Sequence, residues 1–152
     1  MIRVYTDGGC FGNPGPGAWA YVFENDRKKI SGRGAVRETT NNRMELTAVI
    51  EALKFVQSTE ENHDEVDLYT DSQYVKRGIT EWIKRWIING WRNASKKPVK
   101  NKDLWVELYD LTRKLTVRWH WVLGHSGNEM NELCDRLVKE EMKRLSVSGE
   151  RA

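Results

Sequence analysis

Two aspartates that end two similar apolar segments could together bind a cation. The sequence Tyr-Thr-Asp occurs at residues 5–7 and again at 69–71. Each copy closes a run in which apolar and polar residues alternate, as they do in a half-buried β-strand. If the two strands are parallel neighbours, Asp7 and Asp71 stand ~5 Å apart at the strand ends. Carboxylates that close repel one another, and either a proton or a bound cation offsets the repulsion.

Each aspartate alone also has a purely structural explanation, because Asp-Gly and Asp-Ser are common turns after strands. Two more acids bear on the choice. Glu45 lies in the first turn of a helix expected at 43–56, which is apolar around most of its circumference. A carboxylate on a buried face is costly unless it is paired, whereas a surface glutamate would favour a helix N-terminus. Asp135 shares a flank of the last expected helix with Asn131.

The elements that would position these acids follow from the hydrophobic pattern. The expected strands are residues 2–7, 18–23, 30–36, 66–71 and 116–122. The expected helices are 43–56, 72–78, one that contains Trp82 and Trp86 and ends at Asn89-Gly90, 103–115, and one after Asn128. Thr39-Thr40-Asn41-Asn42 stands before the first of these helices and is typical of a helix cap.

This order of elements predicts an α/β fold of the mixed α+β type, with a five-stranded mixed sheet flanked by about five helices. The first three strands form an antiparallel meander, and helical crossovers return the last two strands parallel to the first. In such sheets ligands bind at the carboxyl ends of the parallel strands. Asp7 and Asp71 both stand at such ends.

Composition predicts one globular domain. Of the 152 residues, 39% are hydrophobic and 31% charged, and the domain is expected over residues 1–145. Residues 146–152 hold too few apolar side chains to pack and are expected to form a mobile tail. No apolar run approaches the ~20 residues that span a bilayer, and the N-terminus enters a strand pattern rather than a signal peptide. Cys10 and Cys134 lack metal-ligand spacing, so a reducing, cytoplasmic location is expected.

Residues 76–102 form a basic segment. It holds nine lysines and arginines but one acid, Glu81, in a chain whose net charge is +3, and it contains three of the seven tryptophans. Basic residues interleaved with aromatic ones indicate a polyanion such as nucleic acid as partner, although a solvated helical face is the plainer explanation. The glycine-rich residues 8–17 lack the Gly-Lys-Ser/Thr ending and the following helix of a phosphate loop. They predict an irregular hairpin connection whose backbone a ligand can approach closely.

Several motifs, taken in chain order, resemble one family. They are Tyr5–Cys10 with Gly12–Gly17, Thr39–Leu46, Thr70–Val75, Trp91–Trp105, Trp121–Gly127 and Asn131–Asp135. Together they are collinear over roughly residues 2–145 and resemble bacterial ribonuclease HI, a type 1 ribonuclease H.

The resemblance implies the ribonuclease H-like fold and an endonuclease that cuts the RNA strand of an RNA–DNA hybrid, leaving 5′-phosphate and 3′-hydroxyl ends. It maps the four acidic residues of the family onto Asp7, Glu45, Asp71 and Asp135. These would hold two Mg²⁺ ions ~4 Å apart, and Mn²⁺ could substitute. His125 resembles the group that assists proton transfer or product release, although a lone histidine is more often structural.

The resemblance also implies the substrate contacts. The RNA strand would meet Cys10, Gly12, Asn13 and Gln73, with Asn41 and Asn42 in the minor groove. The DNA strand would lie along Trp82, Trp86, Lys84, Arg85, Arg92, Lys96 and Lys97, with Thr40 and Asn101 at a phosphate. Alternatively, Trp82 and Trp86 pack inward from their own helix. The expected protein is a monomer without an obligatory protein partner or a membrane.

The sequence departs from the family pattern at two places. Ile87-Ile88-Asn89 stands where the family often has basic residues, and Glu38 replaces a frequent basic residue. Lost phosphate contacts would weaken hybrid binding. The alternatives to an active ribonuclease H are a hybrid-binding module without catalysis and another nuclease or transferase on the same fold, such as an integrase-like domain. The four intact acids argue against the first, and the basic segment and the His125 turn argue against the second.

Overall fold

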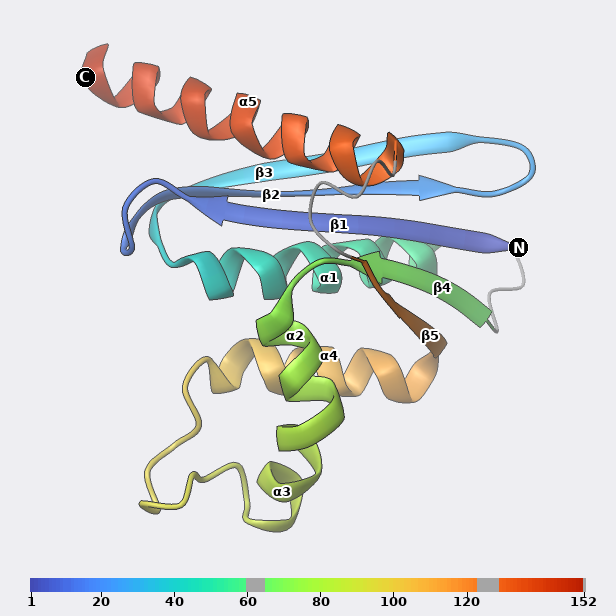
Figure 1. The fold of residues 1–152 in the computed structure, drawn as a ribbon, viewed down its shortest axis with the longest axis vertical. Helices are drawn as coiled ribbons and strands as arrows, with labels where there is room; N and C mark the ends of the chain where they lie inside the picture. The colour runs from blue at the N-terminus through green and yellow to red at the C-terminus, as the bar shows by residue number, and fades with distance from the viewer. Residues whose placement is uncertain (60–64, 123–128, 152) are drawn as a thin grey trace.

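A central five-stranded sheet organises the computed structural model, which describes residues 1–59, 65–122 and 129–151, with side chains up to residue 145 (Figure 1). The strands are β1 (Ile2–Cys10), β2 (Gly15–Glu24), β3 (Lys29–Thr39), β4 (Glu65–Thr70) and β5 (Thr116–Trp121). The helices are α1 (Asn41–Ser58), α2 (Gln73–Arg77), α3 (Ile83–Ile88), α4 (Lys102–Lys114) and α5 (Glu129–Arg151), and a π-helical turn, η1 (Gly78–Trp82), joins α2 to α3.

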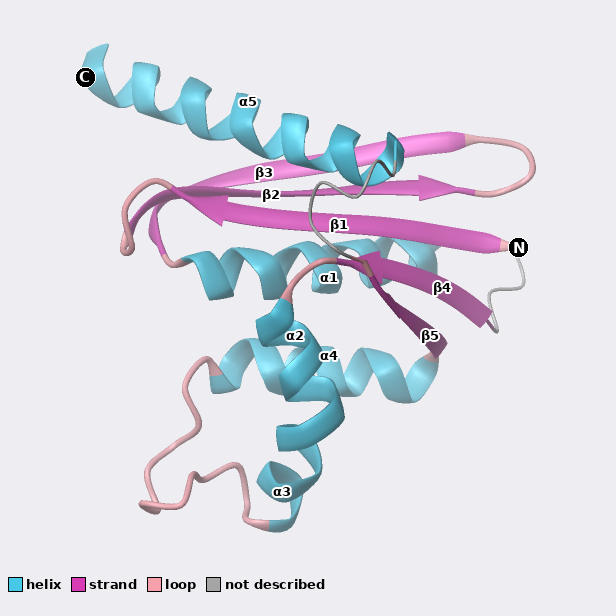
Figure 2. Ribbon diagram, in the orientation of Figure 1, coloured by secondary structure: helices cyan, strands magenta, loops and turns pink. Residues whose placement is uncertain are grey.

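The strand order is β3-β2-β1-β4-β5, with β1 to β3 antiparallel and β4 and β5 parallel to β1. The predicted mixed sheet is therefore confirmed. Helices α1 and α4 pack on one face, and α5 crosses β1, β2 and β3 on the other (Figure 2). Period-2 alternation in the strands explains these two layers, because successive side chains point to opposite faces of the sheet.

Most of the core lies between the sheet and α1. Val4 and Leu68 of the sheet are fully buried together with Leu46 and Leu53 of α1 and Leu108 of α4. Opposite them, Tyr5 and Val22 pack against Cys134 of α5. The apolar circumference of α1 thus reflects its burial, as the sequence pattern predicts. The side-chain oxygen of Thr40 accepts a hydrogen bond from the Arg43 backbone N–H, which confirms the predicted helix cap.

The helix predicted over residues 72–78 is present as α2, with Gly78 as its C-terminal cap residue. Gly78 has helical dihedral angles (φ −61°, ψ −48°), and α2, η1 and α3 follow one another without a loop. Gly78 is buried against the indole of Trp105, and a Cβ at this position would lie 1.9 Å from that ring. The glycine is required for this close approach, and the chain continues through it into η1.

The last helix continues to Arg151, beyond the residue where the sequence predicted a mobile tail to begin. The mobility of residues 146–152 stays a prediction. None of the helices in the described parts of the chain is long and apolar enough to cross a membrane.

Candidate active site

The sheet places Asp7 and Asp71 beside the end of one parallel ladder. Asp7 lies within β1, which continues to Cys10 and not only to Asp7 as predicted, because residues 8–10 still pair with β2, and Asp71 directly follows β4. Tyr5 pairs with Tyr69 in the parallel ladder between β1 and β4. Two residues further along each chain come the two aspartates, just beyond the last pair of this ladder. The echo of Tyr-Thr-Asp in the sequence thus marks two segments that are adjacent in space.

Asp7 carries a strongly perturbed carboxyl group. Burial, followed by the charges of Asp71, Asp135 and Glu45, raises its pKa to about 7. The Gly8 backbone N–H donates to its Oδ1 at 3.0 Å, which opposes the rise but does not overcome it. All four acids named from the sequence therefore act on one another electrostatically, although they come from β1, α1, the end of β4 and α5.

Glu45 reaches Asp7 because α1 lies directly against a glycine of β1. A Cβ on Gly8 would lie 2.3 Å from the carbonyl carbon of Met44 and 2.5 Å from the backbone nitrogen of Glu45. The carboxylate of Glu45 accepts hydrogen bonds from the side chains of Asn41 and Ser72. Burial raises its pKa to about 6 in spite of these bonds, with Asp71 adding to the rise.

Asp135 is placed by the packing of α5 on the sheet. The thiol of the preceding residue, Cys134, is fully buried and donates to the Tyr5 carbonyl at 3.3 Å, which orients this turn of the helix over β1. The ammonium of Lys139 lies 2.9 Å from Oδ2 of Asp135. A hydrogen bond to Asp135 raises the pKa of Lys139, and the charges of Asp135 and then Asp7 contribute.

The chemistry of these donors fits a hard divalent cation. They are carboxylate oxygens, which Mg²⁺ and Mn²⁺ prefer, and their mutual repulsion at Asp7 is relieved by positive charge. Among the residues that the structure describes, no three His, Cys, Asp or Glu side chains already converge to hold an ion. Glu45 and Asp135 are instead turned to Asn41, Ser72 and Lys139. A bound cation would compete with these partners for the carboxylate oxygens that they occupy.

The predicted RNA contacts gather around the same α1 terminus. The Asn13 side chain accepts from the Asn41 backbone N–H at 3.2 Å, and Asn41 in turn donates to Glu45. The Cys10 thiol contacts the carbonyls of Gly15 and Thr39 at 3.3 and 3.4 Å. The glycine-rich connection, with Gly12 at φ +68°, is therefore tied to the turn that carries Glu45. Of the remaining predicted RNA contacts, Gln73 is exposed and Asn42 is half-buried.

Trp82 and Trp86 pack partly inward, as one of the two sequence explanations predicts, and their contact with a DNA strand stays a prediction. The two rings are half-buried, and the Trp86 ring packs edge-on against that of Trp105 at 5.3 Å between centroids. With Tyr74, Asn93, Val99 and Lys100, the two tryptophans also line an open hollow of about 330 Å³. Around them, Lys84, Arg85, Arg92, Lys96 and Lys97 are exposed. The tryptophans thus pack on their inner sides and leave outer edges available to a ligand.

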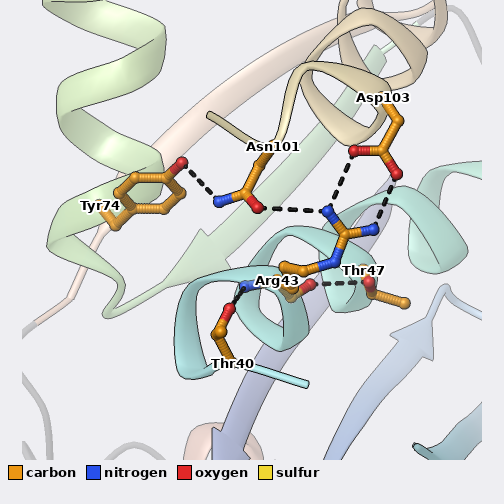
Figure 3. A network of polar contacts seen from close by, with 6 residues as sticks. All are labelled: Thr40, Arg43, Thr47, Tyr74, Asn101 and Asp103. Atoms are coloured by element: carbon orange, nitrogen blue, oxygen red, sulfur yellow. Dashed lines mark hydrogen bonds and ion pairs between the residues drawn. The ribbon is translucent and has the colours of Figure 1, made fainter. Parts of the chain in front are cut away.

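A polar network connects the basic segment to α1 (Figure 3). The Arg43 guanidinium donates to the side-chain amide oxygen (Oδ1) of Asn101 at 3.2 Å and to both carboxylate oxygens of Asp103 at 3.0 and 2.7 Å. The Asn101 amide and the Trp105 indole N–H donate to the Tyr74 hydroxyl at 3.1 and 2.9 Å. Arg43 directly follows the predicted contacts Asn41 and Asn42. Sequence reasoning missed Arg43 because its partners lie more than fifty residues away.

A second missed feature lies across the sheet, two residues before Asp7 and Asp71 in β1 and β4. The rings of Tyr5, Tyr69 and His120 stack across β1, β4 and β5, with centroids 4.7 and 4.5 Å apart. Buried Asp67 receives two bonds from Arg118, at 3.0 and 3.1 Å, and contacts Nε2 of His120 at 2.8 Å. Burial alone would raise the pKa of Asp67, but the bonds from His120 and Arg118 outweigh it and lower the pKa.

His125 lies in residues 123–128, outside the described residues, so its predicted role stays a prediction.

Comparisons with known proteins agree with one family. The family model for RNase H matches residues 1–143. Curated relatives named Ribonuclease H include one from Ehrlichia ruminantium (strain Gardel), 55% identical over 143 residues that cover 93% of this chain and 94% of the relative. Another, from Pseudoalteromonas atlantica, is 54% identical over 140 residues, covering 91% and 88%.

Solved structures agree as well. The crystal structure of LC9-RNase H1, a type 1 RNase H with the type 2 active-site motif, aligns with a TM-score of 0.83 and 31% identity, covering 95% of this chain and 72% of that one. LC11-RNase H1, solved in complex with an RNA/DNA hybrid, aligns with a TM-score of 0.73 over 95% and 98% of the two chains. At 24% identity, this second likeness supports the fold alone.

Proposed function

Because the chain belongs to the ribonuclease H family, we propose that it hydrolyses the RNA strand of RNA–DNA hybrids by metal-assisted catalysis. The observation that carries the proposal is that burial and the charges of Asp71, Asp135 and Glu45 together raise the pKa of Asp7. The electrostatic cost of gathering four acids from separate elements is offset by a proton, as the raised pKa of Asp7 indicates, or by a bound cation, which a metal site would supply. Curated relatives of more than 50% identity that carry the name Ribonuclease H supply the class of reaction.

The four carboxylates would have different roles in binding two metal ions. Asp7, central in the cluster, would bridge two divalent ions. Glu45 and Asp71 would complete one ion site, and Asp71 or Asp135 the other. When bound, such a pair lowers the pKa of the attacking water and stabilises the leaving 3′-oxygen, which yields 5′-phosphate and 3′-hydroxyl ends. The network through Asn13, Asn41 and Glu45 holds the carboxylate of Glu45 in place beside the predicted RNA path.

Hybrid recognition would use two surfaces on either side of the carboxylates. Cys10, Asn13 and Gln73 would contact ribose 2′-hydroxyls, which would distinguish RNA from DNA. The basic segment would hold the DNA strand, with sugars over the outer edges of Trp82 and Trp86 and a phosphate between Thr40 and Asn101. The Arg43 network fixes the distance between these surfaces, because it joins Asn101 to α1.

The substrate preference is tested with matched duplexes of one sequence: an RNA–DNA hybrid, duplex RNA and duplex DNA. With Mg²⁺ we expect cleavage of the hybrid alone, and end-group analysis should find 5′-phosphate and 3′-hydroxyl termini. Equal cleavage of duplex RNA would refute the substrate assignment. Tight hybrid binding without any cleavage would instead support a non-catalytic binding module.

Replacing His125 by Ala should slow turnover without abolishing it. The predicted role of this imidazole is to assist proton transfer or product release, which contributes about 10²–10⁴-fold at most. Steady-state rates on the hybrid, with and without the substitution, measure the effect. A loss as complete as that of Asp7→Asn would place His125 among the essential groups, and an unchanged rate would remove it from the mechanism.

The exposed Ile87-Ile88 pair should limit affinity for the hybrid. The side chain of Ile88 is 82% exposed and that of Ile87 37%, at the end of α3 in the basic segment. We expect Ile87→Lys/Ile88→Lys to strengthen binding of the RNA–DNA hybrid at low salt. The plot of the logarithm of the association constant against the logarithm of the salt concentration should become steeper by about 1–2. Ser31→Lys, exposed on the opposite edge strand β3, serves as the control for added charge. Equal slopes for the three proteins would contradict the prediction.

A further inference from the structure

Lys139 is the one group in the described carboxylate site that already supplies a full positive charge. It follows Asp135 by one turn of α5, and its ammonium lies 2.9 Å from Oδ2 of that carboxylate. The side chain is 65% exposed, so it can move into solvent at little cost, and that of Asp135 is 35% exposed. The same ammonium interacts with Asp7, the most strongly perturbed acid in the site.

We propose that Lys139 is a built-in counter-ion, which holds Asp135 in the metal-free protein and competes with a divalent cation for it. The inference rests on the proposed function, since it assumes that Asp135 is a metal ligand. An ammonium and a metal ion cannot occupy the same lone pairs of Oδ2. The positive charge of Lys139 also disfavours a second cation nearby, so a metal ion that uses Asp135 competes with the ammonium.

This arrangement has two opposite consequences. Without metal, Lys139 offsets part of the repulsion among the four carboxylates and so stabilises the fold. With metal, the same ammonium competes with the ion for Asp135 and repels it, which lowers the affinity for the ion. Lys139→Gln should therefore bind Mg²⁺ and Mn²⁺ about two- to fivefold more tightly, the range that the strength of an exposed ion pair allows. Its metal-free melting temperature should fall, whereas the rise on adding Mg²⁺ should become larger.

The test is calorimetric titration of Mg²⁺ and of Mn²⁺ into the whole protein, together with melting curves at several metal concentrations. Lys139→Arg keeps the charge and should behave as the unsubstituted chain does. Lys143→Gln removes an exposed lysine one turn further along α5 and should leave metal affinity unchanged. Asp7→Asn identifies which part of the binding belongs to the carboxylate site.

The outcomes separate the two proposals. If the unsubstituted protein shows no binding that Asp7→Asn removes, the metal site itself is wrong. If such binding exists but Lys139→Gln has the same or a weaker affinity, the counter-ion role of Lys139 is refuted and the metal site stands. Equal tightening in Lys139→Gln and Lys143→Gln would reduce the effect to net charge and would also overturn the inference.

Discussion

Asp7→Asn should abolish hybrid cleavage and at the same time make the metal-free protein more stable. Loss of the bridging carboxylate removes several kcal/mol of transition-state stabilisation, at least ~10³-fold in rate. The stability gain follows from linkage. Asp7 has a pKa of about 7 in the folded protein, above its value in the unfolded chain. Folding therefore loses stability as the pH rises from about 4 to about 7, and the loss persists above pH 7.

Asparagine carries no charge, so the substitution should restore about 2–4 kcal/mol at pH 8 and almost nothing at pH 4. Urea unfolding of both proteins at these two pH values, in the presence of chelator, measures the difference. Asp67→Asn is the matched control, because Asp67 is a buried aspartate whose pKa is lowered. Its contribution to stability is present above its unfolded pKa and lost as the pH falls through the folded pKa. That variant should be destabilised at pH 8, and a destabilised Asp7→Asn would contradict the account.

Gly8→Ala should damage the fold and the site together. The added methyl group would lie 2.3 Å from the Met44 carbonyl carbon and 2.5 Å from the Glu45 nitrogen, and both are backbone atoms where the first turn of α1 passes into the second. Because this turn cannot yield as a flexible side chain would, we expect a loss of about 3 kcal/mol in the free energy of unfolding. The turn would also move away from β1 and take Glu45 with it, so metal affinity and cleavage should fall in the molecules that remain folded.

Gly9→Ala is the neighbouring control for this substitution. A Cβ on Gly9 meets the Val138 side chain at 3.4 Å, an ordinary contact, and its other near atoms belong to the flexible side chain of Met142. Urea unfolding should therefore separate the two variants by at least ~2 kcal/mol. Equal stability would show that α1 does not depend on close approach at Gly8. A destabilised Gly8→Ala with unchanged metal affinity would separate the packing from the placement of Glu45.

Local pattern was sufficient where a feature depends on neighbours in the chain. The alternation of residues 2–7 and 66–71 predicted two strands, and their order with intervening helices predicted the parallel ladder that ends two residues before Asp7 and Asp71. Features that depend on long-range contacts could not be predicted from the sequence. Gly78 has the same local signature whether it ends a helix or admits the ring of Trp105. Likewise, the bond between Asp67 and His120 depends on a strand register that neither segment reveals alone.

The central claim is that the protein cuts the RNA strand of a hybrid with the help of a divalent cation held by carboxylates that include Asp7 of β1 and Asp71 just after β4. It is tested most directly by one hybrid that carries different labels on its two strands, incubated with the protein in Mg²⁺ and again with excess chelator. The account predicts that the RNA strand alone is shortened, and only in Mg²⁺. Cleavage that persists in chelator, or a hybrid whose RNA stays intact in Mg²⁺, would contradict it.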